Sequence, residues 1–182
     1  MNVNISQNGK KNIIIDKLTI NNDFKSHHSK KPKATIPTPN RKKIFIVHGH
    51  DKNSVDELKK YLQNELKYSE PIVLSETACD GKTIIEAFEE AAENTGLVFV
   101  FLTPDDLVND EYMQARPNVL FELGYFMEKL GRESGRVIIL LKGDVRIPSD
   151  LHGIRYIRID NGIYQAGEEI SKAIMASAAD LK

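Results

Sequence analysis

The chain has 182 residues, of which 41% are hydrophobic and 28% charged, and its net charge is −1. This composition is typical of a globular protein with one ordinary domain and an appendage, and it makes nucleic acid an unlikely partner for the whole molecule. One cysteine, Cys79, excludes an internal disulfide and a cysteine metal cluster. We recognise no signal peptide and no membrane-spanning run, so we expect a cytoplasmic protein with no membrane partner.

The first 42 residues differ in character from the rest. Residues 2–21 alternate asparagine with β-branched side chains around an Asn8-Gly9 turn signal, which predicts a β-hairpin appendage over residues 1–24. A hairpin this small needs a surface to pack on, either its own domain or another copy of the chain. Residues 25–42 contain three prolines, and residues 25–43 hold seven Lys or Arg and no acid. We interpret this stretch as a basic linker, with docking to an acidic surface or a nucleic acid as the alternative.

From residue 43 to residue 182 the pattern is that of an α/β domain, with a net charge of −9 over residues 44–182. Apolar runs predict five strands, and helical patterns alternate with them. The strands are KIFIVHG, PIVL, GLVFVFL, RVIILL and IRYIRI, the last with an alternation that suits a sheet edge. The helices begin at Asn53 or Ser54, at Thr83, at Pro117 and at Glu168. This alternation predicts a flavodoxin-like, five-stranded parallel sheet of order 2-1-3-4-5 with helices on both faces.

In such sheets a ligand binds beyond the carboxyl ends of the strands, between strands one and three. Strand one ends in Gly49, His50 and Asp51, and strand three is followed by Thr103 and Asp105. Arg116 precedes the next helix, so it can face the same crevice. We expect these residues to form a binding site. His48 and His50 lack a third ligand, so we expect no metal.

One motif at the second loop is deceptive. ETACDGKT, residues 76–83, follows a strand and precedes a helix, as a phosphate-binding P-loop does. The full motif needs glycine at position 76, which is glutamate here. We interpret the segment as a lid or an interaction loop.

The helix that starts at Pro117 carries an unusual carboxylate. Its apolar stripe consists of Leu120, Leu123, Met127 and Leu130, widened by Val119 and Phe126. Glu122 lies on the flank of this stripe, one turn from Asn118 and from Tyr125. Burying a carboxylate is unfavourable unless it is paired or used, so Glu122 is either a satisfied half-buried glutamate or a functional one.

Five segments in this order carry a family resemblance: IFIVHGHD, GKTIIEAFEE, LTPDD, ARPNVLFELGYFMEKLGR and IPSDLHGI. They resemble the TIR-type effector domains of bacterial anti-phage systems, in the CD-NTase-associated and Pycsar effector family. The resemblance covers about residues 43–178 and implies a TIR fold with NAD glycohydrolase activity. NAD would be the substrate and no cofactor is implied. The products would be nicotinamide and either ADP-ribose or a cyclic isomer, formed after self-association. The glutamate of the family's FELG-type motif is Glu122, and an upstream sensor or cyclic-nucleotide-linked partner would act as the trigger.

A single carboxylate suits this reaction, because nicotinamide is cationic on NAD and leaves as a neutral molecule. Glu122 would stabilise the ribosyl cation, and Phe121 and Tyr125 would shape the pocket. Arg116 would meet a phosphate, Asn118 would bind the substrate, and Gly49 would let the backbone approach the dinucleotide. Two other functions remain open at this point. One is a TIR module that assembles partners without catalysis. The other is an N-glycoside transferase of the nucleoside deoxyribosyltransferase kind, which also uses a glutamate on a flavodoxin-like sheet.

Overall fold

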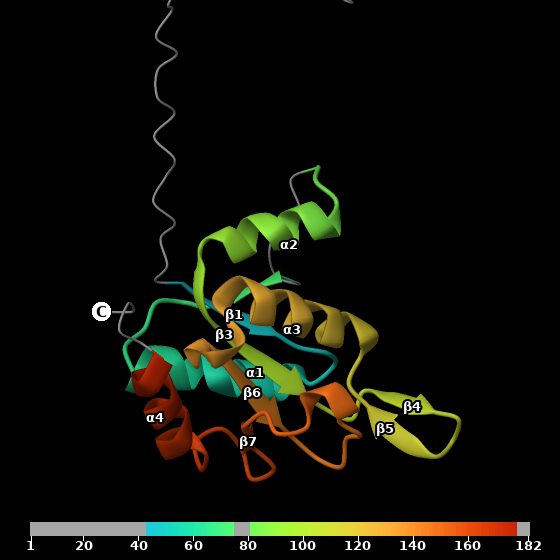
Figure 1. The fold of residues 1–182 in the computed structure, drawn as a ribbon. Helices are drawn as coiled ribbons and strands as arrows, with labels where there is room; N and C mark the ends of the chain where they lie inside the picture. The colour runs from blue at the N-terminus through green and yellow to red at the C-terminus, as the bar shows by residue number, and fades with distance from the viewer. Residues whose placement is uncertain (1–42, 75–80, 178–182) are drawn as a thin grey trace, which may run out of the picture. The chain divides into compact units, whose positions relative to one another are not determined.

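The computed structural model describes residues 43–74 and 81–177 (Figure 1). The predicted hairpin of residues 1–24, the basic linker of residues 25–42 and most of the loop that resembles a P-loop lie outside these ranges, so those predictions stay predictions. Within the described ranges, no helix is both long and apolar enough to cross a membrane.

Five parallel strands form the central sheet. They are β1 (Lys43–Val47), β2 (Ile72–Val73), β3 (Thr95–Leu102), β6 (Val137–Leu141) and β7 (Tyr156–Arg158). Their order is β2-β1-β3-β6-β7, which confirms the predicted flavodoxin-like order and places β7 at an edge. All eight residues of the central strand β3 are buried, as expected for a continuous apolar run covered on both faces.

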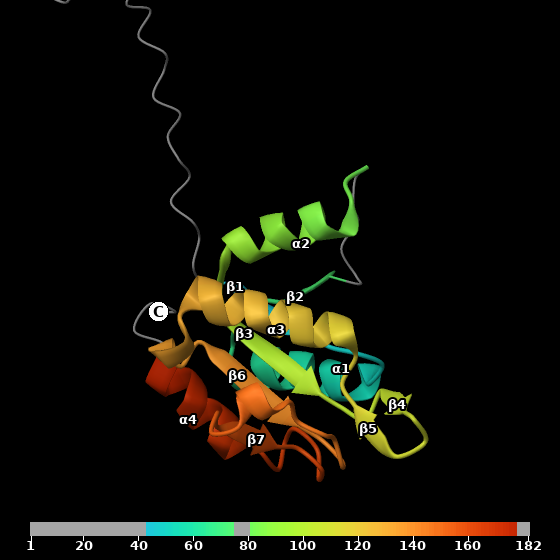
Figure 2. The ribbon, with the colours of Figure 1, turned by 45° about the vertical axis from the view of Figure 1, so that its right-hand side comes forward.

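Helices cover both faces of the sheet. On one face lie α1 (Lys52–Lys60), which continues as a π-helical segment through Glu65, and α4 (Gly167–Ser177). On the other face lie α2 (Ile84–Glu93) and α3 (Pro117–Leu130), and both views show α2 lying outward of α3 (Figures 1 and 2). Two 3-10 turns, Arg132–Ser134 and Ser149–Leu151, complete the described helices.

The residues of α3 divide its surface as the sequence predicted. Its buried side chains are Val119, Leu123, Phe126 and Met127, and Leu120 and Leu130 are half-buried. Phe126 touches Phe45 of β1 and Phe88 of α2, with ring centroids 5.1 and 5.5 Å apart. Burying aromatic rings of this size contributes on the order of 2 to 3 kcal/mol each, which fixes α3, and therefore Glu122, relative to the sheet.

The expected start of the first helix was wrong. We expected Asn53 or Ser54 as its N-cap, whereas Asp51 holds that place and its carboxylate accepts a hydrogen bond from the Ser54 N–H at 3.1 Å. Aspartate is as good an N-cap as serine or asparagine, and Ser54 lies three residues further on, where its N–H needs an acceptor.

The stretch between β3 and α3 is more ordered than we expected. It contains an antiparallel hairpin of β4 (Asp106–Val108) and β5 (Tyr112–Gln114). The turn is closed by a hydrogen bond from the Glu111 N–H to the Val108 carbonyl, and Asn109 and Asp110 have φ of 50° and 55°. Asn and Asp tolerate this left-handed conformation better than other non-glycine residues, which explains the turn. Three-residue strands are too short for a periodicity signal.

Candidate functional site

The loops after β1 and β3 meet at the carboxylate of Asp105. It accepts hydrogen bonds from the backbone N–H of His50 and from the hydroxyl of Thr103, both at 2.9 Å. The Asp105 side chain is only 3% exposed, and a buried carboxylate with two donors is satisfied. Asp105 and Thr103, both predicted as ligand-binding, are therefore engaged in holding the two loops together.

Gly49 packs directly against the carboxylate of Asp105. A Cβ at this position would lie 1.9 Å from a carboxylate oxygen of Asp105. The space beside the Gly49 backbone is thus filled by the protein's own aspartate. Any larger residue would push Asp105 away from its two donors.

His50 connects this buried carboxylate to an exposed arginine. Its Nε2 lies 3.0 Å from Nη1 of Arg116, and its Nδ1 lies 3.8 Å from Asp105. A guanidinium can only donate, so Nε2 of His50 accepts and the ring proton of the neutral imidazole is on Nδ1, toward Asp105. The chain from Asp105 through His50 to Arg116 places a guanidinium at the start of α3, where a phosphate could bind.

Asp51, another predicted ligand-binding residue, is also tied to the fold. It bonds the Ser54 hydroxyl and the ammonium of Lys142, both at 2.7 Å. Burial alone would raise the pKa of Asp51, but the hydrogen bonds from Lys142 and Ser54 outweigh it and lower that pKa. Sequence reasoning missed Lys142, although it directly follows β6 and so lies at the same sheet edge.

Glu122 lies on the second turn of α3 and is half-buried, at the border between exposed and apolar faces that the helical spacing indicated. Burial raises the pKa of its carboxyl from 4.5 to about 7. No hydrogen bond or ion pair links this carboxyl to another side chain of residues 43–74 or 81–177. Arg116 precedes it by six residues, about 9 Å along the helix axis.

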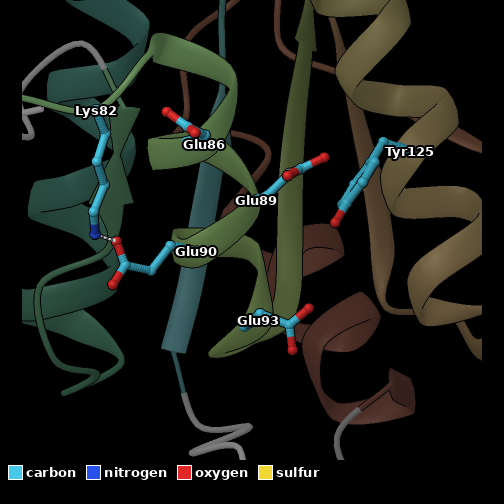
Figure 3. A pocket seen from close by; sticks show the side chains of 6 residues that line it. All are labelled: Lys82, Glu86, Glu89, Glu90, Glu93 and Tyr125. Carbon is cyan, nitrogen blue, oxygen red and sulfur yellow. Dashed lines mark hydrogen bonds and ion pairs between the residues drawn. The ribbon is translucent and has the colours of Figure 1, made fainter.

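The other three predicted pocket residues divide between two environments. Phe121 is 58% exposed and Asn118 is exposed, so both can meet a ligand at the surface of α3. Tyr125 instead projects toward α2 (Figure 3). Its ring packs on the ring of Phe88, with the two ring centroids 4.9 Å apart, and lies beneath the Lys129 ammonium. It lines a hollow of about 450 Å³ whose other lining residues are Lys82, Glu86, Glu89, Glu90 and Glu93.

Residues 81–83, the described part of the loop before α2, contribute to the start of that helix. Thr83 is the N-cap of that helix and exchanges hydrogen bonds with Glu86 in a capping box. Lys82 is ion-paired with Glu90. Gly81, Lys82 and Thr83, the residues that resemble a P-loop, thus include a helix cap and an ion pair. Within the described residues no group of three His, Cys, Asp or Glu is placed to hold a metal ion.

This geometry can be set beside known proteins. Residues 43–161 match the family model described as "CAP12/Pycsar effector protein, TIR domain". The chain belongs to this family. The match covers most of the described fold and includes every residue of the candidate site, and it confirms the resemblance drawn from the five sequence segments.

Three curated relatives are similar to this TIR domain. YuaY of Escherichia coli K12 is 42% identical over 134 residues, which cover 71% of this chain and 44% of YuaY. The protein tirC of Dictyostelium discoideum is 34% identical over 146 residues, 72% of this chain and 71% of tirC. CD-NTase-associated protein 12 of Niabella drilacis is 34% identical over 85 residues, 43% of this chain and 27% of that protein. The TIR domain therefore spans less than half the length of two of these relatives.

Proposed function

We propose that this TIR domain is an NAD glycohydrolase whose catalytic group is the carboxylate of Glu122. The observation that carries the proposal is the position of Glu122, which is half-buried on the second turn of α3, the helix that begins after Arg116, and whose pKa burial raises to about 7. A carboxyl that the fold keeps partly away from water, with its pKa raised toward neutrality, is typical of a functional group.

The reaction needs one carboxylate. The bond between C1′ of the ribose and the nicotinamide nitrogen breaks, and both electrons stay on nitrogen, which neutralises the pyridinium. The ribose is left as an oxocarbenium cation, and the Glu122 carboxylate stabilises this charge more strongly in a site with little water. A water molecule then adds to C1′ and gives up its proton, which yields ADP-ribose. Attack by a group of the same nucleotide would give a cyclic isomer.

The raised pKa of Glu122 links catalysis to substrate binding. At pH 7 the empty site holds a mixture of the protonated and ionised carboxyl, because burial disfavours the charge. The pyridinium of NAD brings an opposite charge, which favours the ionised form. Binding of the substrate therefore produces the catalytic carboxylate in the place where the positive charge of the transition state develops.

Arg116, six residues before Glu122, is a binding group for the rest of the substrate. Arg116 can donate to the pyrophosphate while His50 holds its guanidinium in place. Asp105 supports His50 from below through the backbone N–H. In this account Thr103, Asp105 and Gly49 position the site and do not themselves touch NAD.

We also propose that the reaction serves antiviral defence and is controlled by assembly. The family description names effector proteins, and the relative from Niabella drilacis is called CD-NTase-associated protein 12. That name suggests an upstream partner linked to cyclic-nucleotide signalling. Such a partner would bring copies of the TIR domain together, and loss of NAD would then stop the infected cell.

Incubation of the purified chain with NAD, followed by mass spectrometry of the products, tests this function. Release of nicotinamide with ADP-ribose or a cyclic isomer supports it. Exchange of nucleosides without loss of NAD would instead support the transferase alternative. If NAD stays intact at every protein concentration although the protein assembles, the result supports the alternative of a TIR module that assembles partners without catalysis.

A further inference from the structure

A second hollow lies between the β4–β5 hairpin and the loop after β6. It has a volume of about 510 Å³, which is ample for one nucleoside, and it is separate from the hollow beside α2. Its lining residues are Leu107, Glu111, Tyr112, Met113, Asp144 and Arg146. Leu107 is 58% exposed and so offers apolar surface that a ligand can cover.

The walls of this hollow are fixed. The Arg146 N–H donates to the Met113 carbonyl at 2.9 Å, which joins the loop to the hairpin. The Gly143 N–H donates to the carboxylate of Asp160 at 2.7 Å, which holds the start of the same loop. A preformed hollow loses little conformational freedom when a ligand enters it.

The chemistry of the lining suits a purine that carries an amino group. The Arg146 guanidinium lies over the Tyr112 ring, 4.3 Å from the ring centre, so the two groups stack on each other and a flat base can extend the stack at its outer face. Leu107 and Met113 add apolar contact. The carboxylates of Glu111 and Asp144 accept hydrogen bonds, as the exocyclic amine of adenine requires.

The order of these residues along the chain adds a second argument. β5 leads through Arg116 directly into α3, and the hairpin and α3 extend to opposite sides of this junction (Figures 1 and 2). The sequence of groups is thus Tyr112, Arg116 and Glu122. It matches the order of adenine, pyrophosphate and nicotinamide ribose in NAD. We propose that this hollow binds the adenine end of the dinucleotide, an inference that rests on the proposed function of Glu122.

Binding of AMP to the full chain, measured by calorimetry, tests the hollow without any catalysis. Loss of the stacking ring in Tyr112→Ala should weaken AMP binding about tenfold or more. Leu107→Glu, at an exposed side chain that the fold does not need, should do the same, because it replaces the apolar contact with the base by a charge that loses water when AMP binds. Tyr164→Ala is the matched control, because Tyr164 is a 52% exposed tyrosine in the segment before α4, outside the hollow.

Kinetics separate this proposal from that of Glu122. Nicotinamide mononucleotide has the same scissile bond as NAD and no adenosine. Tyr112→Ala should raise KM for NAD about tenfold, leave kcat unchanged and leave cleavage of the mononucleotide unchanged. AMP that does not bind the wild-type chain, or that binds both hollow variants as tightly as the control, overturns the adenine hollow even where NAD is cleaved. Weakened AMP binding in a chain that does not cleave NAD supports the hollow and refutes only the catalytic proposal.

Discussion

Replacing Glu122 with glutamine should stabilise the folded protein, and by an amount that depends on pH. The carboxyl has a pKa of 4.5 when exposed and of about 7 in the fold, so burial favours its protonated form. One pKa unit corresponds to about 1.4 kcal/mol, which sets the full effect at about 3 kcal/mol when the carboxyl is ionised. Because Glu122 is only half-buried, solvent screening reduces this to about 1 to 3 kcal/mol.

The sign follows from proton binding. Between pH 4.5 and 7 the folded state holds the Glu122 proton more tightly than the unfolded state does, so the stability of the wild-type protein falls as the pH rises through this window. Glutamine cannot ionise, so the stability of the Glu122→Gln variant lacks this fall with pH. The difference in unfolding free energy between Glu122→Gln and wild type should therefore be small at pH 5 and reach its full value by pH 8.

Urea unfolding followed by circular dichroism at pH 5, 6, 7 and 8 measures this difference. Glu128→Gln is the matched control, because Glu128 is an exposed glutamate on the same helix, and its substitution should leave the stability nearly unchanged at every pH. A Glu122→Gln variant that is less stable than wild type at pH 8, or whose gain is the same at pH 5 and pH 8, would refute the argument from burial.

Three further predictions concern activity and packing. The kcat/KM for NAD should rise with pH through about pH 7 as Glu122 ionises in the free protein. The rise in kcat should come at a lower pH, because the bound pyridinium favours the ionised carboxylate, and two coincident pH profiles would contradict this reasoning. Gly49→Ala should lower the free energy of unfolding by about 1 to 3 kcal/mol, because its Cβ would overlap Asp105, whereas Gly124→Ala, in open space within α3, should raise it by about 0.5 to 1 kcal/mol. Similar effects of the two substitutions in urea unfolding would argue against close packing at Gly49. Specific activity should rise with protein concentration, because we expect copies of the chain to assemble through the predicted hairpin of residues 1–24, whose exposed edge would pair with another. Deletion of residues 1–40 should therefore abolish the assembly seen by light scattering and leave the domain folded, whereas an unchanged oligomer would exclude a role for the hairpin.

The fold was predictable because its signals are strong and local. Apolar runs such as that of β3 are typical of strands covered on both faces, and Thr83 with Glu86 marks a helix start in the sequence itself. The clustering of Gly49, His50 and Arg116 followed from one topological rule about parallel sheets.

The contacts within the cluster were not predictable. Nothing in the sequence shows that Asp105 fills the space beside Gly49, because that contact depends on the relative height of two strands. Asp51, which we predicted to bind a ligand, caps α1 and pairs with Lys142, a partner that is 91 residues away in sequence. The β4–β5 hairpin was missed because each strand has three residues, and with it the hollow that faces the loop after β6.

The catalytic role of Glu122 is the central claim, and one comparison tests it most directly. Wild-type and Glu122→Gln chains, both shown to be folded by circular dichroism, are incubated with NAD at equal and increasing concentrations, and released nicotinamide is quantified by mass spectrometry. The account predicts steady release by the wild-type chain and a rate at least about 100- to 1000-fold lower for the variant, because the amide lacks the charge that stabilises the ribosyl cation. Equal release by the two chains would contradict it.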